Sequence, residues 1–356
     1  MKLITMNKTS RREFIQTILA SVAMAPGIMS MQRMDKRGIP TRPLGSTGER
    51  VSIIALGGWD SVANKTDQES IKMMHEALDE GVFFWENAWE YHDGRAEAVM
   101  GKALAESGKR DQVFLMSKTC ARDYKGAKQH LEDTLRRFKT DHLDLWQFHS
   151  IQYQGDTDLV YDEDNGGLKA AMEAKKEGKV RFIGFTGHMH PECHLQMIER
   201  GYQWDTVQLP LNICDAHYNS FQKRVLPEVN KRKMGALGMK SLAAQNARIH
   251  QELKVEVPLL RKYVLSLPIA SLVCGIQKPE ELRSDIEVAR TFKPLEKQEI
   301  KRLLDISYDA SQDGQIEYYK DRNSYFGCSY HSRLLMEETG LSKYEINSCG
   351  LSESGS

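Results

Sequence analysis

The stretches VFLMSK at residues 113–118 and LDLWQFH at residues 143–149 decide the fold of this chain. Each is a short, almost continuously apolar run that ends at an ionisable residue, and such runs are typical of β-strands covered on both faces. Residues 82–91 (VFFWENAWEY) repeat the pattern, with Glu86 after the apolar part and Tyr91 shortly beyond it. Ionisable groups at the carboxyl ends of successive parallel strands predict an active site at that end of a barrel.

A short apolar run followed by a helix-like segment occurs eight times along the chain. The expected strands are 51–56, 82–85, 113–117, 143–148, 181–185, 206–209, 235–238 and 271–273, and the expected helices are 68–80, 96–107, 125–138, 167–177, 192–200, 221–231, 258–266 and 280–289. Eight such units over roughly 250 residues predict an α/β fold of the (β/α)8 TIM-barrel type. A doubly wound sheet is the alternative, but residues 56–60 (LGGWD) lack its usual glycine-rich dinucleotide loop.

The composition shifts along the chain predict four segments. We expect a signal peptide at residues 1–25, a linker at 26–40, the barrel with an extra C-terminal helix at 41–310, and a tail at 311–356. The tail is rich in aromatic residues without clear periodicity. They either cover the pocket or pack on the outside of the barrel, and they are Tyr318, Tyr319, Tyr325, Phe326, Tyr330 and Tyr344.

The N-terminal segment resembles a twin-arginine (Tat) export signal. Residues 10–15 read SRREFI, a moderately apolar stretch follows to Met24, and residues 23–25 (AMA) fit a signal-peptidase site. The stretch is too short and too weakly apolar for a stable membrane span. An ordinary amphipathic helix is the alternative. We therefore predict export by the Tat machinery to the periplasm or beyond.

The overall composition excludes some partners. Hydrophobic residues make up 40%, charged residues 28%, and the formal net charge is zero, so nothing indicates nucleic-acid binding. The six cysteines form no Cys-x-x-Cys pair, and their spacing gives no disulfide framework. If a disulfide forms, Cys328 with Cys349 is the pair that the sequence suggests.

The ionisable residues at the strand ends form a set that can move a proton to or from a carbonyl oxygen. A phenol has an ordinary pKa of about 10, and a neighbouring ammonium lowers it by stabilising the phenolate. Lys118 would supply this charge to Tyr91, and Glu86 would hold Lys118 ionised. His149 would donate a hydrogen bond to the substrate oxygen.

Residues 81–97 (GVFFWENAWEYHDGRAE) resemble the signature of the aldo-keto reductases. The resemblance continues through Lys118, His149, residues 184–187 (GFTG) and residues 275–282 (GIQKPEEL), and covers about residues 40–290. It implies a (β/α)8 barrel, hydride transfer with NADP(H) or less often NAD(H), and a carbonyl or alcohol substrate. The catalytic tetrad of the family falls on Glu86, Tyr91, Lys118 and His149. Glu86 stands where the family has Asp, a change that we expect to preserve activity.

The resemblance also implies a cofactor site. Thr186 and Gln208 align with residues that bind the nicotinamide carboxamide. The loop after the last strand, with Gly275 and Gln277, would carry the adenosine phosphate, and Lys278 and Arg283 would meet a 2′-phosphate. These cations favour NADP(H). Glu280, Glu281 and Asp285 would instead favour the ribose hydroxyls of NAD(H).

Two tryptophans and a histidine-rich run complete the candidates. Trp59 and Trp89 would form an aromatic wall for a sugar or an apolar carbonyl substrate, or else pack on the rim. The run HMHPECH at residues 188–194 has loose metal-ligand spacing, and we expect no metal. A metal-dependent hydrolase and a non-catalytic nucleotide-binding barrel that acts as a redox sensor or regulatory subunit are the alternatives to an oxidoreductase.

Overall fold

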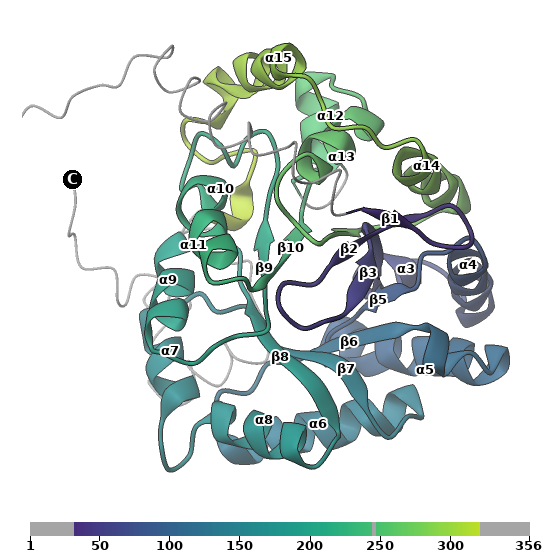
Figure 1. Ribbon diagram of the computed structural model, residues 1–356, viewed down its shortest axis with the longest axis vertical. Coiled ribbons are helices and arrows are strands. Elements are labelled where there is room, and N and C mark those ends of the chain that lie inside the picture. Colours follow the sequence, from purple (N-terminus) through teal and green to yellow (C-terminus); the bar gives the residue numbers. More distant parts are fainter. Residues whose placement is uncertain (1–31, 244–246, 321–356) are drawn as a thin grey trace, which may run out of the picture.

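Eight parallel strands form a closed barrel in the computed structural model, which describes residues 32–243 and 247–320 (Figure 1). Each strand pairs with the next one along the chain, and pairing of β11 with β4 closes the barrel. The predicted TIM-barrel fold is therefore confirmed. The strands are β4 (Ile54–Gly57), β5 (Phe84–Glu86), β6 (Phe114–Thr119), β7 (Leu143–Phe148), β8 (Val180–Thr186), β9 (Thr206–Pro210), β10 (Gly235–Met239) and β11 (Ser271–Cys274).

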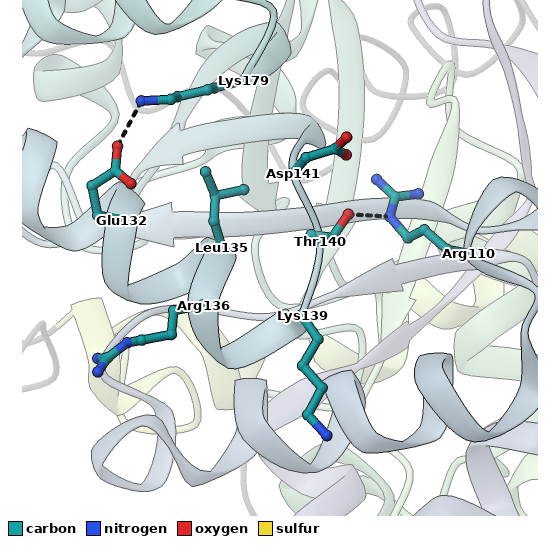
Figure 2. A pocket seen from close by; sticks show the side chains of 8 residues that line it. All are labelled: Arg110, Glu132, Leu135, Arg136, Lys139, Thr140, Asp141 and Lys179. Atoms are coloured by element: carbon teal, nitrogen blue, oxygen red, sulfur yellow. Dashed lines mark hydrogen bonds and ion pairs between the residues drawn. The ribbon is translucent and has the colours of Figure 1, made fainter.

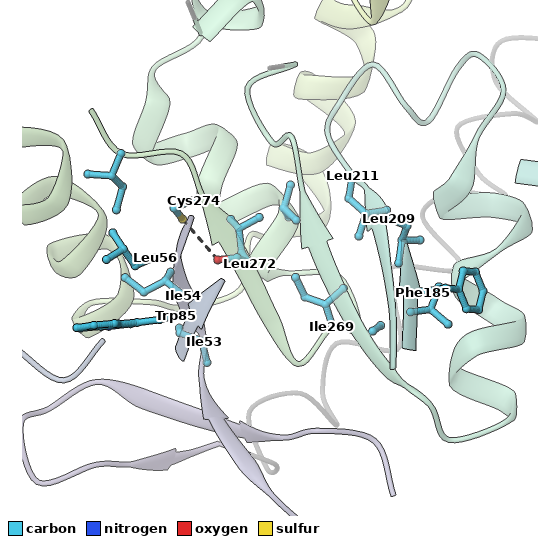
Figure 3. Packing of buried hydrophobic residues seen from close by; sticks show 14 of the residues in the cluster. Ile53, Ile54, Leu56, Trp85, Phe185, Leu209, Leu211, Ile269, Leu272 and Cys274 are labelled. Carbon is cyan, nitrogen blue, oxygen red and sulfur yellow. Dashed lines mark hydrogen bonds between the residues drawn. The ribbon is translucent and has the colours of Figure 1, made fainter. Parts of the chain in front are cut away.

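Helices surround the barrel, and apolar side chains fill the layer between helices and strands (Figures 1 and 3). They are α3 (Gly58–Val62), α4 (Asp67–Asp79), α5 (Arg95–Ser107), α6 (Tyr124–Phe138), α7 (Gln154–Tyr161), α8 (Gly167–Lys176), α9 (Pro191–Glu199), α10 (Phe221–Arg224), α11 (Leu226–Lys231), α12 (Arg248–Leu253), α13 (Val257–Leu265), α14 (Pro279–Arg290) and α15 (Lys297–Ser307). Within the described ranges, no helix has both the length and the apolar character needed to cross a bilayer.

The strand expected at residues 51–56 divides into two. β3 (Arg50–Ser52) joins β1 (Arg33–Met34) and β2 (Pro40–Pro43) in a small antiparallel sheet, and β4 of the barrel begins at Ile54. The Ser52 hydroxyl donates to the Ile54 carbonyl at 2.8 Å, at the point where the chain changes sheet. Residues expected to be an irregular linker thus contribute the first strand.

The small sheet closes the amino-terminal end of the barrel. Val51 of this sheet and Leu44, directly after β2, pack with the barrel-interior side chains Phe84, Leu145 and Leu237. The neighbouring Arg42 is buried and donates to the backbone carbonyls of residues 265 and 269, at 2.9 and 3.0 Å. Apolar packing therefore fills this end of the barrel, and the polar groups gather at the carboxyl end.

The helix expected at residues 221–231 also divides, because Pro227 lies in the first turn of α11 and cannot continue the ladder of α10. Helix α4 is capped by Thr66, which forms a capping box with Glu69. Asp67 pairs with Arg95 and Lys102. Helix α7 had no expected counterpart in the sequence.

The last described segment is fixed by a buried cluster of charges. Lys320, in the 3₁₀ helix η5 (Tyr318–Lys320), donates from Nζ to Asp215 at 2.6 Å and to Glu317 at 2.8 Å, and all three side chains are buried. The Tyr319 hydroxyl donates to Glu317 at 2.6 Å. These bonds join the C-terminal part of the chain to the loop after β9.

Lys320→Met should reduce the free energy of unfolding by roughly 3–5 kcal/mol, because it leaves two carboxylates buried without their cation. The measurement is urea unfolding of both proteins. Lys109→Met is the control, since Lys109 pairs with Asp79 on the surface, where the loss should not exceed about 1 kcal/mol. Equal losses in the two variants would contradict the importance of this cluster.

Candidate active site

The four residues of the expected tetrad lie together at the carboxyl end of the barrel. Glu86 is the last residue of β5, Lys118 lies near the end of β6, and His149 follows β7 directly. Tyr91 opens the 3₁₀ helix η1 (Tyr91–Gly94). The Lys118 ammonium contacts the Glu86 carboxylate and lies 3.3 Å from the Tyr91 hydroxyl, and the rings of Tyr91 and His149 meet edge to face at 5.5 Å.

The turn after β5 holds Tyr91 in place. The Trp89 amide donates to the Lys118 carbonyl at 3.0 Å, and the Tyr91 amide donates to the Ala88 carbonyl at 3.1 Å. The next two residues, His92 and Asp93, have φ values of 51° and 54°, a left-handed conformation that is unfavourable for side chains with a Cβ. The backbone is therefore strained next to the phenol, a feature common at functional sites.

Glu86 spans the gap between two neighbouring segments. One carboxylate oxygen contacts Lys118, and the other accepts from the Gly58 amide at 3.3 Å. Gly58 permits this approach, because a Cβ there would lie 2.7 Å from the Glu86 carbonyl oxygen. The additional methylene, relative to Asp, thus lets one carboxylate reach both partners.

Burial controls the protonation of the tetrad. We expected Lys118 to lower the pKa of Tyr91, but burial and the nearby Glu86 and Glu90 carboxylates raise that pKa well above its usual value. Burial also lowers the pKa of Lys118, against the opposing effect of Glu86, and the pKa of His149. Tyr91 is therefore a neutral phenol at neutral pH, and the expectation of a lowered pKa is wrong.

Glu90 is a site residue that the sequence analysis missed. Its Oε1 lies 3.2 Å from His149 Nδ1, and both side chains are largely buried. Only its position directly before Tyr91 could have indicated it.

Glu90, Cys120 and His149 bring donor atoms within 4.8 Å of one another, as metal ligands would. However, Cys120 is disulfide-bonded and has no thiolate to offer. The cysteine that is bonded to Cys120 lies outside the described residues. Cys328 and Cys349 also lie outside them. Cys193, Cys214 and Cys274 are free thiols.

Two buried side chains, one at the end of β8 and one in the middle of β9, have polar atoms that fit a ligand. Thr186 and Gln208 are direct neighbours in the strand register. The Thr186 hydroxyl and the side-chain Oε1 of Gln208 are buried without a hydrogen-bond partner in the described part of the chain. Because buried polar groups are rarely left unpaired, a bound group that donates and accepts, such as a carboxamide, fits between them.

The loop after β11 lies against α3, the short helix that directly follows β4. Gln277 donates to Asp60 at 2.9 Å, and Gly275 lets Asp60 approach, since a Cβ there would lie 2.2 Å from the carboxylate. Glu281 accepts from the backbone amides of Gln277 and Lys278, at 2.7 and 3.2 Å, and leaves the Lys278 side chain exposed. Lys278 therefore remains available to an anionic ligand.

The other charges of α14 have partners within the protein. Arg283 donates from Nε to Glu76 of α4 at 2.7 Å, which holds its guanidinium on the outer surface. Asp285 is buried and forms two hydrogen bonds of 3.1 Å with Arg261. The idea that Asp285 meets ribose hydroxyls is therefore wrong, and Arg283 reaches a phosphate only if it leaves Glu76.

Lys240 is a second residue that the sequence analysis missed. It follows β10, as an ionisable residue at a strand end, and its ammonium lies 5.1 Å from the centre of the Tyr319 ring. Burial lowers the pKa of Lys240 to about 8, against the opposing effects of Asp60 and Glu86. These electrostatic interactions connect Lys240 with the carboxyl end of the barrel.

The two tryptophans face different surroundings. Trp59 is 42% exposed and packs edge to face against the Tyr91 ring, with ring centres 5.3 Å apart. It therefore borders the expected tetrad. Trp89 instead stacks on His130 of α6 at 3.7 Å, and its indole donates to Asp133 at 3.3 Å. Trp89 thus packs against a helix and forms no wall with Trp59.

The histidine run of residues 188–194 does not come together as a metal site among the described residues. The buried His194 packs against Phe185 and Phe221, with ring centres at 5.2 and 4.9 Å. His188 lies beside Ser150, at 3.5 Å, and beside the Tyr319 ring. The metal-dependent hydrolase therefore has no support from this arrangement.

An open pocket of about 830 Å³ lies elsewhere, as Figure 2 shows. Its lining includes Arg110, Thr140 and Lys179, which precede β6, β7 and β8. The amino-terminal ends of these strands are the end of the barrel opposite the tetrad. The volume of this pocket therefore does not identify the active site, because the ionisable residues of the tetrad lie at the carboxyl end of the barrel.

The arrangement is that of a (β/α)8 oxidoreductase barrel with a phenol, an ammonium, a carboxylate and an imidazole at its carboxyl end. The chain belongs to the aldo/keto reductase family, whose profile its residues 53–252 match.

Similarity to known proteins supports the assignment to this family. Aldo-keto reductase YhdN of Bacillus subtilis is 32% identical over 215 residues, 54% of this chain and 59% of that protein. L-galactose dehydrogenase of Arabidopsis thaliana is 26% identical over 58% of this chain and 66% of its own length. The chain thus spans about three fifths of the length of these relatives. An aldo-keto reductase of Bacillus halodurans, in its holo form, has the same fold, with a TM-score of 0.62 and 19% identity over 77% of this chain and 99% of that one.

Lys240→Met should stabilise the protein at pH 7, by about 1–3 kcal/mol, because it removes a charge that is partly withdrawn from water. The folded pKa of Lys240 lies below the usual 10.5, so the charge destabilises the fold below pH 8, and the gain should disappear between pH 8 and 10.5. Urea unfolding at pH 7 and pH 10 measures this difference.

Lys278→Met is the matched control, since this lysine is exposed and its removal should give no such pH dependence. A loss of stability for Lys240→Met at pH 7 would show that the charge of Lys240 stabilises the fold.

Proposed function

We propose that this chain is an exported, NAD(P)(H)-dependent oxidoreductase that reduces an aldehyde or ketone, or oxidises the corresponding alcohol. The observation that carries the proposal is the group of half-buried Tyr91 with buried Lys118 and Glu86, in which the Tyr91 hydroxyl lies 3.3 Å from the Lys118 ammonium. Such a group can give a proton to an oxygen atom in a water-excluded site.

Three residues of the tetrad, Tyr91, Lys118 and Glu86, have defined tasks in this proposal. Tyr91 is a neutral phenol and gives its proton to the carbonyl oxygen of the substrate. The Lys118 ammonium stabilises the phenolate that forms, and it is held by Glu86 and by the Asn87 carbonyl at 2.7 Å. The strained turn after β5 keeps the phenol directed at this position.

The nicotinamide cofactor supplies or accepts the hydride when it is bound. Thr186 and Gln208 would hold its carboxamide, and the loop with Gly275, Gln277 and Lys278 would hold its adenosine phosphate end. NADP(H) is the preferred form in this proposal, because Lys278 is exposed for a 2′-phosphate and Asp285 is withdrawn into its pair with Arg261. Lys240 adds a further cation at the same end of the barrel.

The substrate is a small carbonyl compound or alcohol, and a sugar is the class that we favour. The relative from Arabidopsis is named for its action on L-galactose, and Trp59 offers an exposed ring of the kind that packs on a sugar face. Residues 10–15 (SRREFI) support export through the twin-arginine pathway, which carries folded proteins and allows loading of the cofactor beforehand. This segment lies outside the described residues.

Tyr91→Phe should reduce kcat for carbonyl reduction by at least about a thousandfold while the Kd for NADPH changes less than about threefold, because only the proton donor is lost. Steady-state kinetics and nucleotide titration measure the two effects. Tyr124→Phe is the control, since the Tyr124 hydroxyl binds Glu173 on the helix surface.

Retention of most of kcat in Tyr91→Phe would refute the tetrad mechanism. Absence of any turnover in the unaltered protein, with tight binding of nucleotide, would instead favour the non-catalytic barrel.

Gln208→Leu should weaken binding of NADPH by about tenfold, the effect of one lost hydrogen bond, without a change in fold. Calorimetric titration with NADPH and with NADH checks both the loss and the preference between them. Gln203→Leu, at a surface position, should bind as the unaltered protein does. Unchanged affinity of Gln208→Leu for NADPH would show that Gln208 does not bind the cofactor.

A further inference from the structure

Arg137 of α6 contacts the turn that carries Tyr91 at two points. Its Nη1 donates to the Trp89 carbonyl at 2.8 Å, and its guanidinium lies 5.3 Å from the centre of the Trp89 ring. The guanidinium also lies against Gly94, because a Cβ at that position would be 2.3 Å from Arg137 Cζ. Trp89 precedes Tyr91 in the turn and Gly94 follows it. One side chain therefore holds the turn on both sides of the phenol.

A buried carboxylate fixes the Arg137 side chain. Glu97 of α5 is fully buried, and its Oε2 accepts from Arg137 Nη1 at 2.9 Å. Its Oε1 accepts from the hydroxyls of Ser117, at 2.5 Å, and Thr134, at 2.8 Å. Ser117 directly precedes Lys118 in β6. These hydrogen bonds connect the turn after β5 with the strand that carries the ammonium partner of Tyr91.

The network acts on the phenol through the backbone of the turn. His92 and Asp93 have left-handed φ values, and such a conformation persists only where the surrounding structure holds it. A hydrogen bond from a charged donor, like that of Arg137, is stronger than one from a neutral donor. Without this bond the turn can relax, and the Tyr91 hydroxyl then leaves its position 3.3 Å from the Lys118 ammonium.

We propose that Arg137, oriented by Glu97, is a positioning residue that keeps the Tyr91 phenol within reach of the substrate carbonyl. The inference rests on the proposed function, in which Tyr91 gives its proton to that oxygen. Loss of Arg137 then lowers the rate of proton transfer and leaves the affinity for nucleotide in place. The reason is that the residues proposed to bind the nucleotide lie on other elements, namely β8, β9 and the loop after β11.

Arg137→Met should lower kcat for carbonyl reduction by about tenfold to a hundredfold, because a displacement of about 1 Å in a catalytic group has effects of this size. The Kd for NADPH should change less than about threefold. Arg302→Met is the matched control, since Arg302 pairs with Glu299 on the surface of α15, and it should keep both values. Arg137→Lys should recover part of the lost kcat, because an ammonium can still donate to the Trp89 carbonyl and to Glu97.

A double variant separates positioning from stability. Burial raises the pKa of Glu97, although its hydrogen bonds with Ser117, Arg137 and Thr134 oppose the shift, so the carboxyl can take up a proton once Arg137 is removed. Glu97→Gln combined with Arg137→Met removes the carboxylate as well. This protein should regain stability in urea unfolding but not kcat, because the Trp89 carbonyl still lacks its donor. Recovery of kcat together with stability would show that the network only stabilises the fold, and it would overturn the inference.

Carbon-13 NMR of the protein with labelled tyrosines tests the position of the phenol and requires no turnover. The Tyr91 signal, assigned with Tyr91→Phe, should shift in Arg137→Met and stay in place in Arg302→Met. An unchanged Tyr91 signal, or an unchanged kcat, in Arg137→Met overturns the inference and leaves carbonyl reduction in place. If the unaltered protein reduces no carbonyl compound, the proposed function fails, and the NMR comparison still decides whether Arg137 positions the phenol.

Discussion

The buried ion pair between Lys118 and Glu86 is the interaction on which the rest of the site depends. It joins the ends of two neighbouring strands, β5 and β6, and the second oxygen of Glu86 extends the contact to the Gly58 amide after β4. Removal of two charges from water is expensive, and their mutual attraction offsets this cost only when further hydrogen bonds satisfy them. The Asn87 carbonyl and the Gly58 amide provide those bonds.

The same loss of water determines the chemistry of the neighbouring groups. Burial keeps Tyr91 protonated, and it lowers the pKa of Lys118, His149 and Lys240. It also leaves polar atoms of Thr186 and Gln208 without partners in the described chain. In the proposed function, the polar atoms of Thr186 and Gln208 would bind the nicotinamide carboxamide, and the neutral phenol of Tyr91 would give its proton to the substrate. The carboxyl end of the barrel therefore carries the polar groups that this proposal uses.

The opposite end of the barrel is built for stability. The small sheet β1–β3 closes it with apolar side chains, and the buried Arg42 ties that sheet to two backbone carbonyls before β11. At the carboxyl end, the buried cluster around Lys320 joins η5 to the loop after β9 and places Tyr319 beside His188 and Lys240. Charged interactions thus fix the segment nearest the site, while apolar packing fixes the remote end.

Local sequence patterns were sufficient to predict the fold and the positions of the tetrad residues. The apolar runs locate all eight barrel strands to within a few residues, because strands covered on both faces need continuous hydrophobicity. The rule that ligands bind at the carboxyl ends of such strands then selects Glu86, Tyr91, Lys118 and His149, which the structure brings together. The positions of Thr186 and Gln208 follow from the resemblance to a known family.

Only the tertiary structure decided which partner each polar side chain meets. The sequence contains Glu76, Glu90 and Arg261, but nothing local indicates that they bind Arg283, His149 and Asp285. The direction of the Trp89 ring, the protonation of Tyr91 and the lowered pKa of Lys240 likewise depend on side chains distant in sequence. The physical reason is that periodicity reports burial averaged over an element, whereas pairing and pKa depend on single atoms that the closed barrel brings within a few ångströms.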